Sequence, residues 1–449
     1  MGLVNGSQNT STVGRGFRIG KLGFSLVGSY LSYQAQNLFL GEAQQPQRQL
    51  RFQQKASRRV RQELGALKGP VMKLGQMLSM QTDILPEETL RELALLQMQA
   101  PGMHPSLARA QFKSALGKFP EDLFRHFDPE PFAAASLGQV HRALTRSGQK
   151  VAVKIQYPAI RSAIENDFKL LRSATLPTQL TGHIPAALLD EIQRGLLEET
   201  DYVHEADNLD FFRNGLSGLA YLTIPTVHRE LSTDRVLTMS FIEGETFADL
   251  LRRKPPQAFR DMIAFRLLEM FETQLERLKA LHADHHPGNY LFQPDGSIGL
   301  IDFGCVKRIS FDQAELRRGY QQRAWRESEA AARRFLSLVY GPRVPYARAR
   351  RTLPFLERWA DVVYPQGSTA DLIVDYSADS KLLAKLKQIG IDHWKRILQD
   401  KLINPEFAFL VRADQGLIYL LRELGATVNF SEVWRRVSAA LPAGQPALS

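Results

Sequence analysis

The sequence has a single cysteine, Cys305, so no disulfide can form within the chain. It also has no run of about 18 apolar residues, the length that a membrane-spanning helix needs. Residues 1–6 lack the basic-then-apolar order of a secretory signal. These absences favour a reducing compartment and limit the expected membrane contact to a peripheral one. Cys305 is predicted to be a small buried side chain, with a reactive thiol as the alternative.

Positive charge is concentrated in the first part of the chain. The formal net charge is +10, and residues 1–70 hold ten Lys or Arg against two Glu, a local net charge of +8. Apolar residues spaced three or four apart predict an amphipathic helix there: Phe24, Val27, Leu31, Ala35 and Leu38. A helix of this kind is typical of segments that lie on anionic lipid, and packing on the protein's own core is the alternative. Nucleic acid is disfavoured as a partner because no groove-reading motif accompanies the charge.

Two motifs in the second half of the chain predict phosphoryl-transfer chemistry. Residues 282–289 read His-x-Asp-x-x-x-x-Asn, and Asp-Phe-Gly follows at residues 302–304. Transfer of a phosphoryl group needs a carboxylate beside the attacking group and oxygen ligands for magnesium. The spacing therefore predicts Asp284 as the catalytic carboxylate, and Asn289 and Asp302 as the magnesium ligands.

A hairpin is expected to carry these residues. Apolar runs at 290–292 and 299–301 flank the turn signal Pro294-Asp295-Gly296, which would place both metal ligands on one wall of a cleft. A zinc site is the competing interpretation, with candidate ligands His282, Asp284, His285 and His286. It is disfavoured because adjacent histidines on an irregular loop rarely converge on one ion and no cysteine joins them.

Upstream, residues 133–140 align with the kinase phosphate loop Gly-x-Gly-x-x-Gly-x-Val. Ala133 and Ala135 replace the first two glycines, and Gly138 is retained. Residues 151–154 read as the following strand, with Lys154 reaching the phosphates and Glu205 as its candidate partner. The residues expected to contact the nucleotide are Ala133, Ala135, Ser136, Gly138, Val140, Lys154, Glu205 and, at the hinge beside adenine, Glu243.

Taken together, the motifs resemble those of the UbiB-type (AarF/UbiB) atypical kinase-like family. The alanine-rich loop, Glu199-Thr200-Asp201, the Asp-x-His-Pro-Gly-Asn form of the catalytic loop and Lys73-Leu74-Gly75-Gln76 carry the resemblance, which covers about residues 15–430. The departures are small. Thr200 stands within the Glu-x-Asp element, and His285 stands where proline is usual, which leaves the catalytic loop less rigid.

The resemblance implies an α+β, protein-kinase-like fold of two lobes with a helical N-terminal extension and a mostly helical C-lobe. The expected boundaries are a tail at 1–14, the extension at 15–120, the N-lobe at 121–245, the C-lobe at 246–440 and a tail at 441–449. The extension carries the Lys-x-Gly-Gln motif, with Lys73 and Gln76, across the cleft where protein kinases receive a peptide. Lys73 is then expected to pair with Glu199 and Asp201 as a regulatory contact.

Helices are expected at 160–171 and 185–205, a buried strand at 235–241, and almost only helix after residue 256 apart from the catalytic hairpin.

The function that the resemblance implies is an ATPase that uses ATP or ADP with Mg²⁺ and supports isoprenoid quinone (ubiquinone) biosynthesis. Its expected partners are the nucleotide, an anionic membrane surface, a quinone-precursor lipid and quinone-biosynthesis proteins. Its expected place is the cytoplasmic side of the inner membrane, by peripheral association. Two alternatives remain: a true kinase for a small molecule or protein, and a non-catalytic nucleotide-sensing partner protein.

Overall fold

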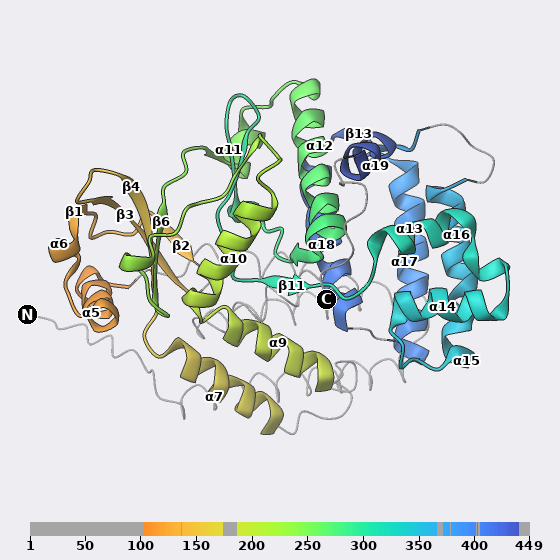
Figure 1. Ribbon diagram of the computed structural model, residues 1–449, viewed down its shortest axis with the longest axis horizontal. Coiled ribbons are helices and arrows are strands. Elements are labelled where there is room, and N and C mark those ends of the chain that lie inside the picture. The colour runs from red at the N-terminus through yellow and green to blue at the C-terminus, as the bar shows by residue number, and fades with distance from the viewer. Residues whose placement is uncertain are drawn as a thin grey trace, which may run out of the picture. The chain divides into compact units, whose positions relative to one another are not determined.

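The computed structural model describes residues 103–135, 137–173, 186–365, 371–377, 379–400, 402 and 405–439 (Figure 1). The chain divides into two compact units, unit 1 (Met1–His204 and Val227–Ser240) and unit 2 (Glu205–Thr226 and Phe241–Ser449). Lys73, Gln76, Ser136 and the amphipathic helix expected around residues 24–38 lie outside the described residues.

Unit 1 is built on a five-stranded antiparallel sheet of order β1-β3-β4-β6, with β2 paired to β3. Its strands are β1 (Phe124–Phe127), β2 (Ala133–Ala135), β3 (Gly138–Thr145), β4 (Lys150–Gln156) and β6 (Val236–Ser240). Its helices are α5 (Pro105–Leu116), α6 (Pro120–Leu123), α7 (Ile160–Ser173), α9 (Ala186–Glu198) and the short η2 (Arg229–Leu231). The expected strands at 151–154 and 235–241 and the helix at 160–171 are confirmed.

The core of unit 1 lies between the sheet and α5, which packs against β4 and β6 (Figure 1). Phe112 of α5 is fully buried, and its ring centroid lies 5.8 Å from that of Phe124 on β1. Val151, Val153 and Ile155 of β4 complete this cluster. Because β4 is buried along nearly its whole length, its position is fixed by packing on both faces.

The predicted single helix over 185–205 is wrong at its end, because two helices are present. α9 ends at Glu198, and α10 (Tyr202–Gly215) begins after three intervening residues. Thr200 Oγ1 donates to the carbonyl oxygen of Leu197 (2.7 Å), and Asp201 Oδ1 accepts from the backbone N–H of Val203 (3.0 Å). Short polar side chains that bond the local backbone in this way favour caps over helix interiors, so the helix breaks here.

Unit 2 is mostly helical. Its helices are α11 (Phe247–Arg252), α12 (Gln257–Thr273) with the π-helical turn η3 (Gln274–Leu278), η4 (Pro287–Asn289), α13 (Gln313–Gln322), η5 (Ala324–Arg326), α14 (Glu329–Tyr340), α15 (Tyr346–Ala349), η6 (Arg350–Thr352), α16 (Leu353–Val363), α17 (Lys381–Asp400), α18 (Pro405–Leu424) and α19 (Phe430–Ala439). α12 packs against α18 and α19 (Figure 1).

Short strands position the motifs of unit 2. They are β5 (Leu222–Thr223), β7 (Glu245–Thr246), β8 (Ala280–His282), β9 (Tyr290–Phe292), β10 (Ile298–Leu300), β11 (Val306–Arg308), β12 (Ile373–Asp375) and β13 (Thr427–Asn429). The predicted hairpin is confirmed as the antiparallel pair β9–β10, and Gly296 in its turn has φ 82°, a conformation that favours glycine. The expectation of almost only helix elsewhere after residue 256 missed β8, β11, β12 and β13, because three-residue strands carry too little periodicity to detect.

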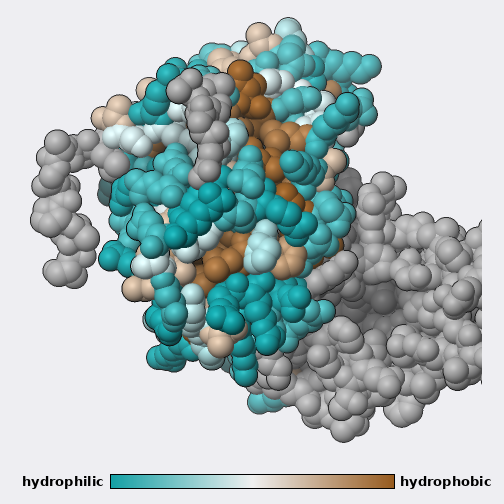
Figure 2. All heavy atoms as spheres, turned by 90° about the vertical axis from the view of Figure 1, so that its right-hand side faces the viewer, coloured by the Kyte–Doolittle hydropathy of each residue, from teal (hydrophilic) through white to brown (hydrophobic). Residues whose placement is uncertain are grey.

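The surface of the helical part of unit 2 is largely hydrophilic, with a band of apolar residues between the charged ones (Figure 2). Among the large apolar side chains of this unit, Ile373 and Tyr419 are exposed. Within the residues that the structure describes, no helix is both long enough and apolar enough to span a bilayer.

Candidate functional site

The catalytic loop of unit 2 runs from β8 through η4 to β9. The backbone N–H of Ala283 donates to the carbonyl oxygen of Cys305 (2.9 Å), and Asn289 Nδ2 donates to the carbonyl oxygen of Asp284 (2.8 Å). The Ile301 N–H donates to the Asn289 carbonyl oxygen (3.1 Å), which ties the loop to the end of β10. Asp284 is only 5% exposed. The structure therefore holds Asp284 and Asn289 in one closed loop.

The predicted metal loop, residues 302–304, lies against the start of the catalytic loop. His282 Nε2 donates to the carbonyl oxygen of Asp302 (2.7 Å), and Asp302 Oδ1 accepts from the Gly304 N–H (3.1 Å). The backbone N–H of His282 is in turn held by Gln274 Oε1 (2.8 Å), from the π-helical turn. A single residue, Ala283, therefore separates Asp284 from the histidine that contacts Asp302. Cys305, next in the chain, is buried as predicted.

The donor set of this loop pair suits magnesium. The amide nitrogen of Asn289 is used by the Asp284 carbonyl, which leaves the amide oxygen as its ligand atom. Asp302 supplies a carboxylate. Hard oxygen ligands of this kind are the ones that Mg²⁺ prefers. Asn289 and Asp302 are thus the residues that could hold the ion.

The zinc alternative requires the nitrogen atoms of His285 and His286 to face one ion, but these histidines form hydrogen bonds within the loop instead. His285 Nδ1 is hydrogen-bonded to Tyr290 Oη, and His286 Nδ1 accepts from the Gly288 N–H (3.1 Å). In the described part of the chain, no group of three or more His, Cys, Asp or Glu side chains is arranged to hold a metal ion. Burial, together with the neighbouring His282, lowers the pKa of His285 to about 3 against the opposing influence of Asp284, so its ring is neutral near pH 7.

Helix α10 supports the metal loop from behind, which sequence reasoning missed. Asn208 Nδ2 donates to the carbonyl oxygen of Phe303 (3.1 Å), and Glu205 Oε1 lies 3.4 Å from the Phe303 backbone nitrogen. The Phe303 ring is fully buried, 5.0 Å from the ring of Phe212. Glu205, expected only as the partner of Lys154, is 2% exposed and contacts the residue after Asp302. Nothing in the local sequence around Asn208 signals its contact with a residue 95 positions away.

Unit 1 carries the phosphate-loop residues. Ala133 pairs with Val140 and Ala135 with Gly138 in the β2–β3 ladder, and Ala133 is exposed. Lys154 of β4 is 6% exposed, and its Nζ lies 5.2 Å from the centre of the Tyr202 ring. This cation–π contact places an aromatic face beside the predicted phosphate-binding lysine. Tyr202 was not among the predicted site residues.

The Glu-x-Asp element also belongs to unit 1, where it forms the turn between α9 and α10. Gln156 Nε2, at the end of β4, donates to the carbonyl oxygen of Thr200 (2.9 Å). Glu199 is 8% exposed, and Asp201 caps α10. The structure therefore brings Glu199 and Asp201 to the same end of the sheet as Lys154, while their predicted partner Lys73 lies outside the described residues.

Glu243, predicted at the adenine hinge, lies in unit 2 just before β7. Glu243 is exposed, and its backbone carbonyl oxygen accepts a hydrogen bond from Gln293 Nε2 (3.4 Å).

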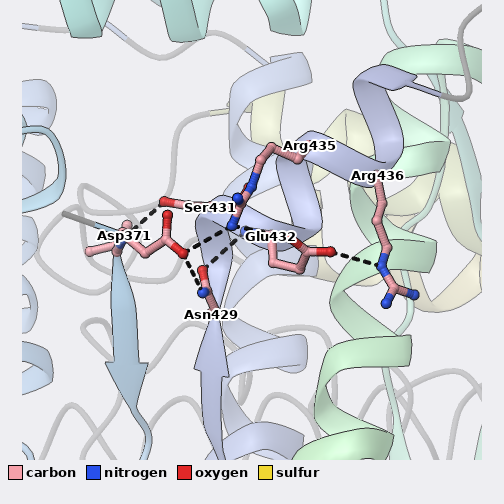
Figure 3. Close-up of polar contacts among 7 residues, drawn as sticks. Asp371, Asn429, Ser431, Glu432, Arg435 and Arg436 are labelled. Atoms are coloured by element: carbon pink, nitrogen blue, oxygen red, sulfur yellow. Dashed lines mark hydrogen bonds and ion pairs between the residues drawn. The ribbon is translucent and has the colours of Figure 1, made fainter. Parts of the chain in front are cut away.

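A separate open pocket of about 440 Å³ lies in unit 2 away from the motifs. Its lining residues are Tyr221, Asp261, Met262, Phe265, Arg266, Glu269, Thr427, Val428, Asn429 and Arg436. Figure 3 shows the polar cluster beside it, in which Asp371 accepts from Asn429 Nδ2 (2.7 Å) and Arg435 Nη2 (2.9 Å). These bonds join the segment before β12 to β13 and α19. None of the predicted site residues lines this pocket.

Residues 95–331 match the family described as the ABC1 atypical kinase-like domain. The chain is 36% identical over 263 residues to the probable protein kinase UbiB of Aeromonas hydrophila, which is 56% of this chain and 48% of that protein. It is 34% identical over 277 residues to AarF domain-containing protein kinase 1 of Mus musculus, covering 60% of this chain and 53% of that protein. A third relative is the chloroplastic ACTIVITY OF BC1 COMPLEX KINASE 7 of Arabidopsis thaliana, 33% identical over 246 residues, 54% of this chain and 35% of that protein. The chain thus spans between about a third and a half of the length of these relatives.

Among solved structures, the chain is similar to that of the Rv3197–erythromycin complex from Mycobacterium tuberculosis. The TM-score is 0.57 at 25% identity, and the match covers 89% of this chain and 100% of that one. The predicted kinase-like α+β fold is confirmed, with an antiparallel sheet first and a mostly helical part after it.

Proposed function

The chain belongs to the ABC1 atypical kinase-like family, and from that premise we propose that it binds ATP or ADP with Mg²⁺ and catalyses ATP-dependent phosphoryl transfer or hydrolysis. The observation that carries the proposal is the closed loop of unit 2, in which Asp284 and Asn289 are bonded to each other and Asp302 is held by His282. A carboxylate and two oxygen ligands in adjacent, hydrogen-bonded loops are what this chemistry requires.

Each residue has a role in the proposal. Asn289 and Asp302 hold the magnesium ion, which when bound neutralises phosphate charge. Asp284 accepts the proton of the attacking hydroxyl or water. Lys154 contacts the phosphates, and Glu205 supports the metal loop through the backbone of Phe303. The backbone around Glu243 binds adenine, and the remaining nucleotide contacts come from Ala133, Ala135, Ser136, Gly138 and Val140.

Regulation by the N-terminal extension is a further part of the proposal. Lys73, in the Lys-x-Gly-Gln motif with Gln76, pairs with Glu199 and Asp201. The support is that Glu199 and Asp201 lie one residue apart in the same turn, where two carboxylates can bracket one ammonium group. That pairing would keep peptide substrates from the nucleotide and favours a non-protein substrate.

For the biological role, we propose support of isoprenoid quinone (ubiquinone) biosynthesis by a protein associated peripherally with the cytoplasmic face of the inner membrane. The resemblance to UbiB-type proteins and the +8 charge of residues 1–70 support this. The decisive observation is the lipid profile of a host that lacks this chain. Loss of a quinone with accumulation of a prenylated precursor is expected, and an unchanged profile would remove the pathway.

The nucleotide site is tested by thermal-shift titration of the full chain with ADP, with Mg²⁺ or with EDTA. At a ligand concentration about 100 times Kd, the expected stabilisation is about 2.7 kcal/mol. Asp302→Asn should lose most of the Mg²⁺-dependent part, because a neutral amide does not offset the charge of the ion. The matched control is Asp379→Asn, which removes the same charge from an exposed residue before α17 and should behave as wild type. Equal stabilisation of all three proteins would show that the metal assignment is wrong.

Product analysis with ATP separates the three functional alternatives. A phosphorylated acceptor indicates a kinase, free phosphate indicates an ATPase, and neither product indicates a nucleotide-sensing partner protein. Asp284→Asn serves as the control, since it removes the proposed proton acceptor and should abolish either product.

A further inference from the structure

The side chain at position 285 occupies a closed environment in the middle of the catalytic loop. His285 is 1% exposed, and its ring contacts three aromatic side chains from three elements. The ring centroids of Phe271 on α12 and His282 on β8 each lie 5.5 Å away, and the Tyr290 ring of β9 is stacked at 6.1 Å with an interplanar angle of 9°. The ring is therefore held in one orientation by packing alone.

Helix α18 closes the remaining side. A Cβ placed on Gly416 would lie 3.0 Å from the Cβ of His285, closer than most Cβ contacts in proteins. A glycine inside a helix lowers helix propensity relative to alanine. At this position the missing side chain allows α18 to lie directly against the backbone of the catalytic loop.

Two cross-links close the loop around the proposed metal ligand. The first joins Asn289 Nδ2 to the Asp284 carbonyl oxygen (2.8 Å). The second, shifted by one residue, joins His285 Nδ1 to Tyr290 Oη. Asn289 lies between the ends of the second link, so its backbone has little freedom to move. In the family pattern a proline stands at position 285, and the pyrrolidine ring of proline fixes φ at this point of the loop.

We infer that His285 is a positioning residue, which through Tyr290 and Gly416 restrains the loop that carries Asp284 and Asn289 in place of the proline usual at this position. The inference rests on the proposed magnesium-nucleotide site and goes beyond it by assigning the source of the loop's rigidity. His285 touches neither substrate nor ion in this assignment; it acts through Asn289.

A feature of the buried ring distinguishes positioning from stabilisation. Among the described residues, His285 Nε2 has no hydrogen-bond partner. A buried polar atom without a partner destabilises the fold. Replacing His285 by leucine and Tyr290 by phenylalanine together removes this atom and both ends of the His285–Tyr290 hydrogen bond. The double variant should therefore leave the stability of the ligand-free protein unchanged or raise it, while it weakens the affinity for magnesium. A residue that only fills the core would lower both.

The experiment uses the full chain as wild type, His285→Leu, Tyr290→Phe, the double variant and His285→Pro. Each is titrated with Mg²⁺ at fixed ADP, with an EDTA arm that reports metal-independent ADP binding, and each is unfolded thermally without ligand. His285→Leu and Tyr290→Phe are each expected to weaken Mg²⁺ affinity roughly tenfold. The double variant is expected to be no weaker than the singles, because both remove one link. His285→Pro should recover most of the loss.

The outcomes separate the two hypotheses. If wild type shows no Mg²⁺-dependent binding of ADP, the proposed function fails. If wild type binds and His285→Leu has wild-type Mg²⁺ affinity, or His285→Pro is as weak as His285→Leu, the positioning role is overturned while the site stands. Should His285→Leu not fold, Tyr290→Phe and Gly416→Ala decide, because a methyl group at 416 presses on the Cβ and backbone of residue 285.

Discussion

The phosphate loop keeps a glycine at position 138, where the neighbouring strand leaves no room for a side chain, while alanines replace the other two glycines. Ala133 and Ala135 lie in β2 and adopt ordinary strand conformations, since neither is among the described residues with positive φ. Gly138 does not have positive φ either. A Cβ at this position would lie 2.3 Å from the carbonyl oxygen of Ile155 on β4. The glycine is thus required by a close approach of two strands, and the alanines are compatible with the strand that they form.

Gly138→Ala is therefore expected to destabilise the protein by about 1–3 kcal/mol, because the neighbouring atom is backbone and the strands must separate. Urea unfolding of the full chain measures this. Gly390→Ala on α17 is the matched control: nothing lies within 4 Å of its added Cβ, so it should be neutral or stabilise by up to about 1 kcal/mol. Equal midpoints for the two variants would show that β3 has room for a side chain.

How far the site could be predicted also depends on the kind of residue. Asp284, Asn289 and Asp302 belong to a motif whose spacing is set by the local loop, so the sequence alone was enough to predict them as site residues. Asn208 holds Phe303 from a position 95 residues away in the sequence, and no local pattern encodes such a contact. Gln274 holds the backbone of His282 from the end of α12, eight residues away, through a π-helical turn that the sequence does not signal. Secondary structure shows the same division between strong and weak local signals. The long strands of the unit 1 sheet were predicted, whereas the three-residue strands β12 and β13 were not.

At the scale of secondary-structure elements, the helices of unit 2 are joined by polar contacts within an apolar core. His393 of α17 is stacked on Phe355 of α16 (5.9 Å, 12°), and its Nε2 is hydrogen-bonded to Tyr340 Oη of α14. Burial lowers the pKa of His393 from 6.5 to about 4. Protonation of this ring would place a charge inside the apolar cluster that joins the three helices, which is unfavourable.

This shift predicts how stability depends on pH. Because the folded-state pKa lies below the unfolded value, the unfolded state binds more protons between pH 6.5 and 4, and stability falls as pH decreases through that window. Each pKa unit is worth about 1.4 kcal/mol, so the loss is at most about 3.5 kcal/mol and smaller for a partly exposed ring. Urea unfolding at a series of pH values should give a shallower acid slope for His393→Gln than for wild type. Parallel curves would show that His393 titrates alike in both states.

At the scale of the whole molecule, two basic segments differ in how many acidic residues are available to pair with them. Residues 313–358 contain eleven Arg against four Glu, but most of these arginines are ion-paired within unit 2, among them Arg317 with Glu272, Arg334 with Glu315 and Arg351 with Asp400. Residues 1–70 have only two acids for ten basic residues, so nearby sequence offers few partners. An anionic lipid surface is therefore expected to attract the first segment more strongly than the second.

Sedimentation with vesicles that contain anionic lipid tests this difference with two charge-matched triple variants. Changing Arg15, Arg18 and Lys21 to Gln removes three charges from the first segment, and changing Arg343, Arg348 and Arg350 to Gln removes three from exposed positions on unit 2. At about 1 kcal/mol per charge near the surface, the first variant should bind on the order of 100-fold more weakly, whereas the second should sediment as wild type does. Deleting residues 1–45 should abolish sedimentation, and raising the salt concentration should weaken it, because screening acts on exposed charges. Equal losses in both triple variants would mean that net charge alone governs binding, and retention of binding by the truncated chain would place the lipid-binding surface elsewhere in the molecule.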